Sequence, residues 1–192
     1  ASGAIPAGTV PGSHYEGHLW LRDLSIVAQT CAQIPEPSHS ALGVKAMRHI
    51  AALYNTPEQR GKWTSFLFHH DPFQKYADAH VLEYPPIFLD IDRRGKLVSS
   101  QRVWCQSQLD AIGAWHWSTF KMANEGQLDL PRLNSGLSRF INRENEHESL
   151  FSVSLRVLNR IRYWDQKDHG FWEAHRLFRR ASSVGAVLSG LH

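Results

Sequence analysis

Apolar residues recur at helical spacing over most of this chain, and this periodicity is the feature that most constrains its fold. Apolar side chains at every third or fourth position predict helices that each bury one face. Five segments show the pattern: 21–31, 42–53, 109–123, 150–161 and 184–191. Pro131 favours a further short helix over 131–140, because proline is well tolerated in a first helical turn. The sequence therefore predicts an all-α fold of helices packed in pairs.

Residues 63–100 break the helical pattern. They contain Pro72, Pro85 and Pro86, short apolar runs such as SFLF and PPIFLDID, and then Arg-Arg-Gly. Proline and glycine at this density are typical of loops, and short apolar runs around a turn are typical of a hairpin. We therefore expect a loop-rich segment with at most one short hairpin.

The two ends of the chain differ in character. Residues 1–17 are rich in Gly, Pro, Ser and Thr, so we expect a flexible N-terminal segment. The last helical segment stays apolar up to the final residue, with no polar tail. A domain usually frays into polar residues at its end. We therefore expect residues 18–192 to be part of a larger domain, with the apolar face of 184–191 covered by further polypeptide or by a second copy.

Composition and charge exclude several classes of protein. Of the 192 residues, 42% are hydrophobic and 20% are charged, which is typical of a globular domain and not of a disordered one. The net charge of +3 is too small an excess to indicate a nucleic-acid partner. No apolar run approaches the ~18 residues of a membrane span, and the N-terminus lacks the features of an intact signal peptide. We expect a cytoplasmic protein, although a signal peptide already removed would leave no trace.

Three short segments combine tryptophan with charged or polar residues. They are GHLWLRD at 17–23, WCQSQLD at 104–110 and DHGFWE at 168–173. Core filling is the more common use of tryptophan, and the alternative is a sugar platform, because indole faces stack on the apolar faces of pyranose rings. Asp23 and Asp110 each fall where a helix begins, so capping or first-turn placement explains each of them equally well.

Glu173 is the carboxylate with the clearest catalytic potential. It follows Gly-Phe-Trp, and an apolar neighbourhood would raise the pKa of its carboxyl group. A carboxyl group that keeps its proton near neutral pH can act as a general acid. The alternative is an exposed loop residue paired with Arg176 or Arg179.

Together, these segments resemble glycoside hydrolase family 15, the glucoamylase-like family that includes the N-terminal domains of the phosphorylase kinase alpha and beta subunits. The resemblance runs with gaps from about residue 14 to 191. The family motifs are W-x-R-D, an aromatic residue followed by Q-x-D, and G-x-W-E, and they occur here in that order. The matching residues are Trp20, Arg22 and Asp23, then Trp104, Gln108 and Asp110, then Gly170, Trp172 and Glu173. The stretches PPIFLDIDRRGKLV and ASSVGAVLSGL are similar to the bacterial and phosphorylase-kinase branch.

The resemblance implies an (α/α)6 toroid with its site at the loop-rich face. Twelve helices need far more than 192 residues, so the chain would be the N-terminal half of that domain. Glu173 would be the general acid of an inverting hydrolysis of α-glucosidic bonds, with the general base outside this chain and no cofactor. The residues assigned to substrate binding are Trp20, Arg22, Asp23, Trp104, Gln108, Asp110 and Trp172.

Other interpretations stay open. A non-catalytic glycan-binding or regulatory module of the phosphorylase-kinase type would use the same sugar pocket without turnover. Ala174 stands where fungal glucoamylases commonly carry a second acid, which weakens a claim of fungal-type starch specificity. Both interpretations imply an α-glucan or oligosaccharide ligand and a second chain or copy that completes the toroid. A metal site at His69, His70, Asp71 and His80 is not predicted, because the spacing matches no known zinc pattern.

Overall fold

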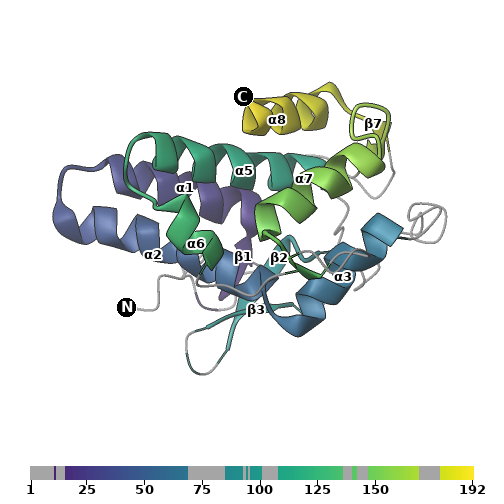
Figure 1. Ribbon diagram of the computed structural model, residues 1–192. Coiled ribbons are helices and arrows are strands. Elements are labelled where there is room, and N and C mark those ends of the chain that lie inside the picture. The colour runs from purple at the N-terminus through teal and green to yellow at the C-terminus, as the bar shows by residue number, and fades with distance from the viewer. Residues whose placement is uncertain are drawn as a thin grey trace.

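The chain is mostly helical, with a small antiparallel sheet at one side (Figure 1). The computed structural model describes residues 11, 16–68, 85–92, 94, 96–100, 108–135, 140–141, 147–168 and 178–192. The helices are α1 (Leu21–Gln33), α2 (Pro37–Tyr54), α3 (Pro57–Phe68), α5 (Leu109–Asn124), α6 (Leu130–Ser135), α7 (Leu150–Arg160) and α8 (Ala181–Leu191). The strands are β1 (His18–Trp20), β2 (Phe88–Ile91), β3 (Leu97–Ser99), β4 (Phe140–Ile141), β5 (His147–Glu148), β6 (Lys167–Asp168) and β7 (Phe178–Arg179).

The five predicted apolar segments are confirmed as helices, and the larger differences in helix bounds are at the starts of α2 and α3 and at the end of α6. Helix α2 begins at Pro37, earlier than the apolar pattern, because proline fits the first turn of a helix. Helix α3 begins at Pro57 and extends into the segment expected to be loop-rich. The short helix predicted over 131–140 is α6, but it ends at Ser135, and Phe140 belongs to strand β4 instead. Most of residues 1–17, expected to be flexible, lie outside the described residues.

The predicted hairpin is present, and it belongs to a sheet of three strands with the order β1-β2-β3. Asp92 shapes its turn, because its Oδ1 accepts the backbone N–H groups of Arg94 and Lys96, each at 2.8 Å. Strand β1 was not predicted. It pairs with β2 and runs directly into α1, where the Leu21 N–H donates to the carbonyl of Ile87 at 2.7 Å. The sheet therefore fixes the start of α1.

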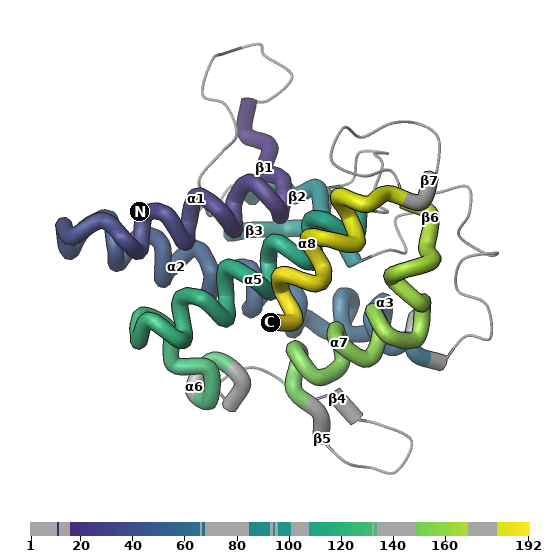
Figure 2. The backbone as a smooth tube through the Cα atoms, turned by 90° about the horizontal axis from the view of Figure 1, so that it is seen from above, coloured from purple at the N-terminus to yellow at the C-terminus, as the bar shows by residue number. Residues whose placement is uncertain are grey.

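Helices α1, α5 and α8 lie side by side and run in the same direction, with α5 between the other two (Figures 1 and 2). The N-termini of the three helices therefore lie at the same end of the layer. Helix α2 packs on α1, and α3 packs on α7. No helix within the described part of the chain is long and apolar enough to cross a membrane.

Helices α5 and α8 touch through their backbones. A Cβ atom added at Gly113 would lie 2.4 Å from the carbonyl carbon of Ala186, and one added at Gly190 would lie 2.7 Å from the carbonyl oxygen of Gly113. No larger side chain fits between the helices at these points. This close contact fixes where α8 begins relative to α5.

An aromatic cluster forms the centre of the core between α2, α3, α5 and α7. The ring centroids of Tyr54 and Trp63 are 5.5 Å apart, those of Tyr54 and Trp115 are 5.0 Å apart, and Phe151 stacks on Trp115 at 5.1 Å. The hydroxyl of Tyr54 donates to the carbonyl of Pro86 at 2.7 Å, so its one polar group is satisfied. Core filling, the more common use of tryptophan, is confirmed at Trp63 and Trp115.

Candidate functional site

The charged residues of the first two tryptophan segments meet where the N-termini of α1, α5 and α8 converge. Arg22 and Asp110 stand in the first turns of α1 and α5, and Gln108 immediately precedes α5. Asp168 on β6 and Ser183 on α8 join them from the third segment and the last helix. We call these five residues the N-terminal cluster. Trp104, Trp172 and Glu173 lie outside the described residues.

A buried ion pair joins α1 to α5 at the centre of the cluster. The Nη1 of Arg22 donates to the Oδ2 of Asp110 at 2.8 Å, and the two side chains are 9% and 4% exposed. Burial alone would lower the pKa of Arg22, but the hydrogen bond and charge of Asp110 raise it above its ordinary value. The guanidinium therefore stays charged and is held in one orientation.

Asp23 is the charged residue of the first segment that faces solvent. Its side chain is 49% exposed, and its Oδ1 accepts a long hydrogen bond of 3.4 Å from the Nε of Arg22. First-turn placement is confirmed for Asp23 and Asp110, whereas the N-cap positions belong to Trp20 and Gln108. The geometry thus presents an exposed carboxylate next to a fixed guanidinium, and carboxylates and guanidinium groups can bind sugar hydroxyls.

Asp110 and Gln108 are buried at this site, at 3% and 2% exposure. Asp110 is engaged with Arg22, so its observed role is to support the guanidinium. Trp20 is 5% exposed, and its ring centroid lies 4.8 Å from that of Phe88 on β2. Direct contact of these three residues with a sugar stays a prediction.

His18 extends the site along β1. Its Nδ1 lies 2.6 Å from the Oδ1 of Asp90, its cross-strand neighbour on β2, and its ring packs against Phe88 with centroids 5.1 Å apart. His18 and Trp20 point to the same face of β1, because alternate residues of a strand share a face. The contact between His18 and Asp90 therefore adds a side-chain link between β2 and β1, the strand that leads into Arg22.

Asp168 is a functional candidate that the sequence analysis did not assign. Its side chain is fully buried, and its Oδ2 accepts the backbone N–H of Leu109 at 2.9 Å. The Nε of Arg180 donates to its carbonyl oxygen at 3.3 Å and lies 3.8 Å from its Oδ1. These partners are far apart in sequence, so only the position of Asp168 at the start of the DHGFWE segment could have drawn attention to it.

The environment of Asp168 disfavours its ionised form. Burial raises the pKa of its carboxyl group to about 6, and the negative charge of Asp110 adds to the rise. Ser183, the Leu109 N–H and Arg180 act in the opposite direction but do not cancel the effect of burial. The carboxyl group of Asp168 therefore titrates at a pH only slightly below neutral.

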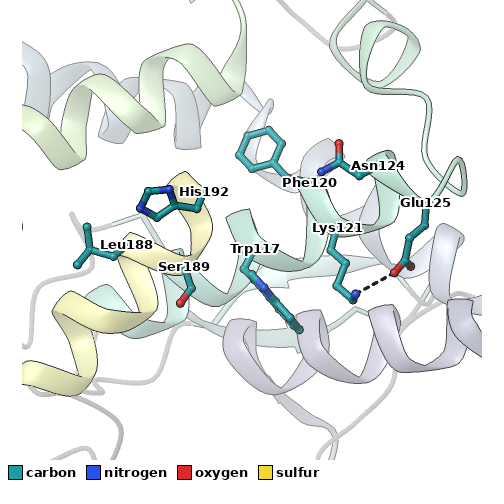
Figure 3. Close-up of a pocket in the computed structure, with 8 residues that line it drawn as sticks. All are labelled: Trp117, Phe120, Lys121, Asn124, Glu125, Leu188, Ser189 and His192. Atoms are coloured by element: carbon teal, nitrogen blue, oxygen red, sulfur yellow. Dashed lines mark ion pairs between the residues drawn. The ribbon is translucent and has the colours of Figure 1, made fainter.

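A separate surface groove of about 700 Å³ lies at the other end of α5 and α8. Figure 3 shows side chains from both helices around it. Its lining residues are Trp117, Phe120, Lys121, Asn124, Glu125, Leu188, Ser189 and His192. Lys121 and Glu125 form an ion pair of 2.8 Å within α5 and its C-terminal end. The groove is lined by no residue of the N-terminal cluster, so it is separate from the candidate sugar site.

No group of three metal-ligating side chains comes together among the residues that the structure describes. His69, His70, Asp71 and His80, considered above for a metal site, lie outside those residues.

Comparisons with known proteins relate the chain to glycosidases. No protein-family model matches it. It is 25% identical over 191 residues to isomaltose glucohydrolase from Kribbella flavida, and the match covers 100% of this chain and 42% of that protein. A solved wild-type glycosidase matches with a TM-score of 0.67, and a glutamate-to-alanine glycosidase variant in complex with glucose matches with a TM-score of 0.68. Both are 24% identical, and the match covers 100% of this chain and 44% of each structure.

These matches establish a distant homology to isomaltose glucohydrolase and a fold shared with part of a glycosidase. The chain spans less than half the length of the relatives that it matches. The mostly helical architecture with a small antiparallel sheet is therefore common to this chain and to part of those larger proteins.

The raised pKa of Asp168 gives a testable dependence of stability on pH. Its folded value of about 6 lies above the ~3.9 of an unfolded aspartate, so the folded state takes up a proton first as the pH falls. This group alone should raise the free energy of unfolding by about 1 kcal/mol between pH 7 and pH 5. Asp168→Asn removes that proton uptake.

Urea unfolding of the wild type and of Asp168→Asn at pH 5, 6 and 7 measures the effect. Taking the difference between the two proteins cancels the histidine contributions, including that of buried His116, whose pKa burial lowers to about 3. We expect the wild type to gain stability relative to the variant as the pH falls. Parallel pH profiles would contradict this account of Asp168.

Proposed function

We propose that the chain forms part of a glucoamylase-type site that hydrolyses α-glucosidic bonds with inversion. The observation that supports this most directly is the fixed guanidinium of Arg22 next to the exposed carboxylate of Asp23, in a chain distantly homologous to isomaltose glucohydrolase. Arginine donates from a rigid fork, and aspartate accepts from two hydroxyl groups. Together they suit the vicinal hydroxyls of a terminal glucose.

Asp110 prepares Arg22 for this task. A guanidinium that is already paired and buried loses little conformational freedom when a sugar binds, so the cost of orientation is met during folding. Gln108, one residue before α5, belongs to the same support. Trp20, Trp104 and Trp172 are the proposed aromatic walls of the pocket.

Glu173 is the proposed general acid. It donates its proton to the glycosidic oxygen as the bond between that oxygen and the anomeric carbon breaks. A water molecule attacks the anomeric carbon from the opposite face and loses its proton to a second carboxylate, typically ~6.5–9.5 Å from the acid. That general base is proposed to lie outside this chain. Glu173 lies in the sequence between β6 and β7. Asp168 of β6 is a member of the N-terminal cluster, and its carbonyl accepts a hydrogen bond from Arg180, the residue after β7.

The proposed architecture is part of an (α/α)6 toroid. Helices α1, α5 and α8 would form the inner layer, and α2 and α7 would belong to the outer layer. Apolar side chains of the inner layer are exposed, among them Trp117 at 36%, Leu188 at 42% and Leu191 at 44%. Trp117 and Leu188 also line the groove in Figure 3. We propose that further toroid helices, from a second chain or copy, cover this surface, because the chain spans 42% of its curated relative.

Isomaltose is the first substrate to test, because the relative is an isomaltose glucohydrolase. A glycan-binding module without turnover is the alternative function. It would share the sugar affinity of Arg22 and Asp23 and would lack the general base.

The hydrolytic function can be tested with Glu173→Gln. The chain alone should release no more β-glucose from isomaltose or maltose than this variant does. General base assistance is worth about 10²–10⁴-fold, and the proposed general-base carboxylate lies outside this chain. When the complementary part of the domain is supplied, wild-type turnover should appear and Glu173→Gln should abolish it. Proton NMR of the released anomer measures rate and stereochemistry together.

Two results would contradict parts of this proposal. Turnover by the isolated chain that depends on Glu173 would mean that this chain or a neighbouring copy supplies the second carboxylate. Sugar binding without turnover in the completed domain would favour the non-catalytic module.

The exposed apolar surface predicts association. Contiguous exposed apolar patches beyond a few hundred Å² are rare on soluble monomers. The purified chain should therefore self-associate and dissociate on dilution in light-scattering measurements. Leu188→Lys should shift it toward monomer, whereas Trp164→Lys, at a 49% exposed tryptophan between α7 and β6, should not. A strict monomer at every concentration would contradict the proposed interface.

A further inference from the structure

Asp168 joins three elements of the structure and has no role in the function proposed above. It lies at the end of β6, its carboxylate contacts the first residue of α5, and it lies beside Ser183 in α8. A buried carboxylate is costly, and an apolar residue of similar volume is often tolerated better at such a position. Its presence at a fully buried site calls for an explanation other than stability.

The first contact replaces a missing helix cap. The N-cap residue of α5, Gln108, makes no side-chain capping hydrogen bond. The Leu109 N–H is one of the four donors that a helix start leaves without an intrahelical partner. The Oδ2 of Asp168 accepts it at 2.9 Å, across 59 residues of sequence. Asp168 therefore fixes the start of α5, one residue before Asp110.

The second set of contacts fixes the base of the β6–β7 hairpin. Asp168 is the register partner of Phe178, and its carbonyl accepts the Nε of Arg180 at 3.3 Å. The segment 169–177, with Trp172 and Glu173 in its sequence, leaves from Asp168 and returns to Phe178. One residue thus links the start of α5, the helix that carries Asp110, to the base of the β6–β7 hairpin.

We propose that Asp168 is a positioning residue that holds α5, with the Asp110 carboxylate that supports the glucose-binding guanidinium of Arg22, in register with the β6–β7 hairpin. Its carboxylate fixes the start of α5, and its backbone fixes the base of the hairpin. This inference rests on the proposed function, because the ligand whose binding depends on that register is a terminal glucose unit.

Two substitutions of similar volume test the proposal. Asp168→Asn keeps an oxygen that can accept the Leu109 N–H, whereas Asp168→Leu fills the same space without an acceptor. Asp92→Ala is the matched control, because it also removes a carboxylate that accepts backbone N–H groups, in the β2–β3 turn away from the site. Calorimetric titration of each folded protein with glucose at pH 7 measures affinity. Hydrogen exchange of the Leu109 amide measures the contact itself.

We expect Asp168→Leu to weaken glucose binding by about tenfold and Asp168→Asn to stay within about threefold of wild type. Asp92→Ala should keep its affinity even where it loses stability. The Leu109 amide should exchange slowly in the wild type and in Asp168→Asn. If the role of Asp168 were purely structural, the substitutions would lower stability, but Asp168→Asn and Asp168→Leu would bind glucose with equal affinity.

The outcomes distinguish this inference from the proposed function. If the wild type binds no glucose, the proposed function and this inference both fall. If the wild type and both variants bind equally, only the role of Asp168 falls. If Asp168→Leu does not fold, Asp168→Asn and the wild type decide. Slow exchange of the Leu109 amide and retained glucose affinity in Asp168→Asn support the proposal. Rapid exchange of that amide in the folded wild type overturns it.

Discussion

The buried ion pair between Arg22 and Asp110 is the interaction on which the arrangement of the site depends. It joins two parallel helices at their first turns, where a carboxylate is also favoured by the helix dipole. Removing one partner of a buried pair commonly costs about 3–5 kcal/mol, because the other charge is left without compensation. The pair therefore fixes α1 against α5, and it fixes the guanidinium in one orientation.

The surrounding structure also fixes the positions of the helices that carry the site. Strand β1 and its partner β2 determine where α1 begins, and the contact of Gly113 with Ala186 determines where α8 begins. Asp168 connects α5 with the hairpin that precedes α8. Several polar groups are thus buried together at one end of a helical layer, at some expense of stability. Such a concentration of buried charge is typical of a binding or catalytic site.

The helices could be predicted from the sequence because their apolar spacing is local information. The start of α3 at Pro57 also carries a local signal, because the Oγ1 of Thr56 accepts the backbone N–H of Gln59 at 3.4 Å. The pairing of β1 could not be predicted, since it depends on neighbours distant in sequence. The motif residues Arg22 and Asp110 could be recognised, and the structure adds that they contact each other across 88 positions. Asp168 was missed for the same reason as β1. Trp104, Trp172 and Glu173 stay predictions, because they lie outside the described residues.

The central claim is that the Arg22 guanidinium binds a glucose unit, and titration of the chain with glucose tests it most directly. Arg22→Lys keeps the charge but loses the planar fork that donates two hydrogen bonds in fixed geometry. Arg162→Lys is the control, at an exposed arginine that follows α7 and whose ion-pair partner is Asp165. The account predicts that Arg22→Lys weakens glucose binding by about tenfold while Arg162→Lys binds as the wild type does. Equal affinity in all three proteins, or no binding by the wild type, would contradict it.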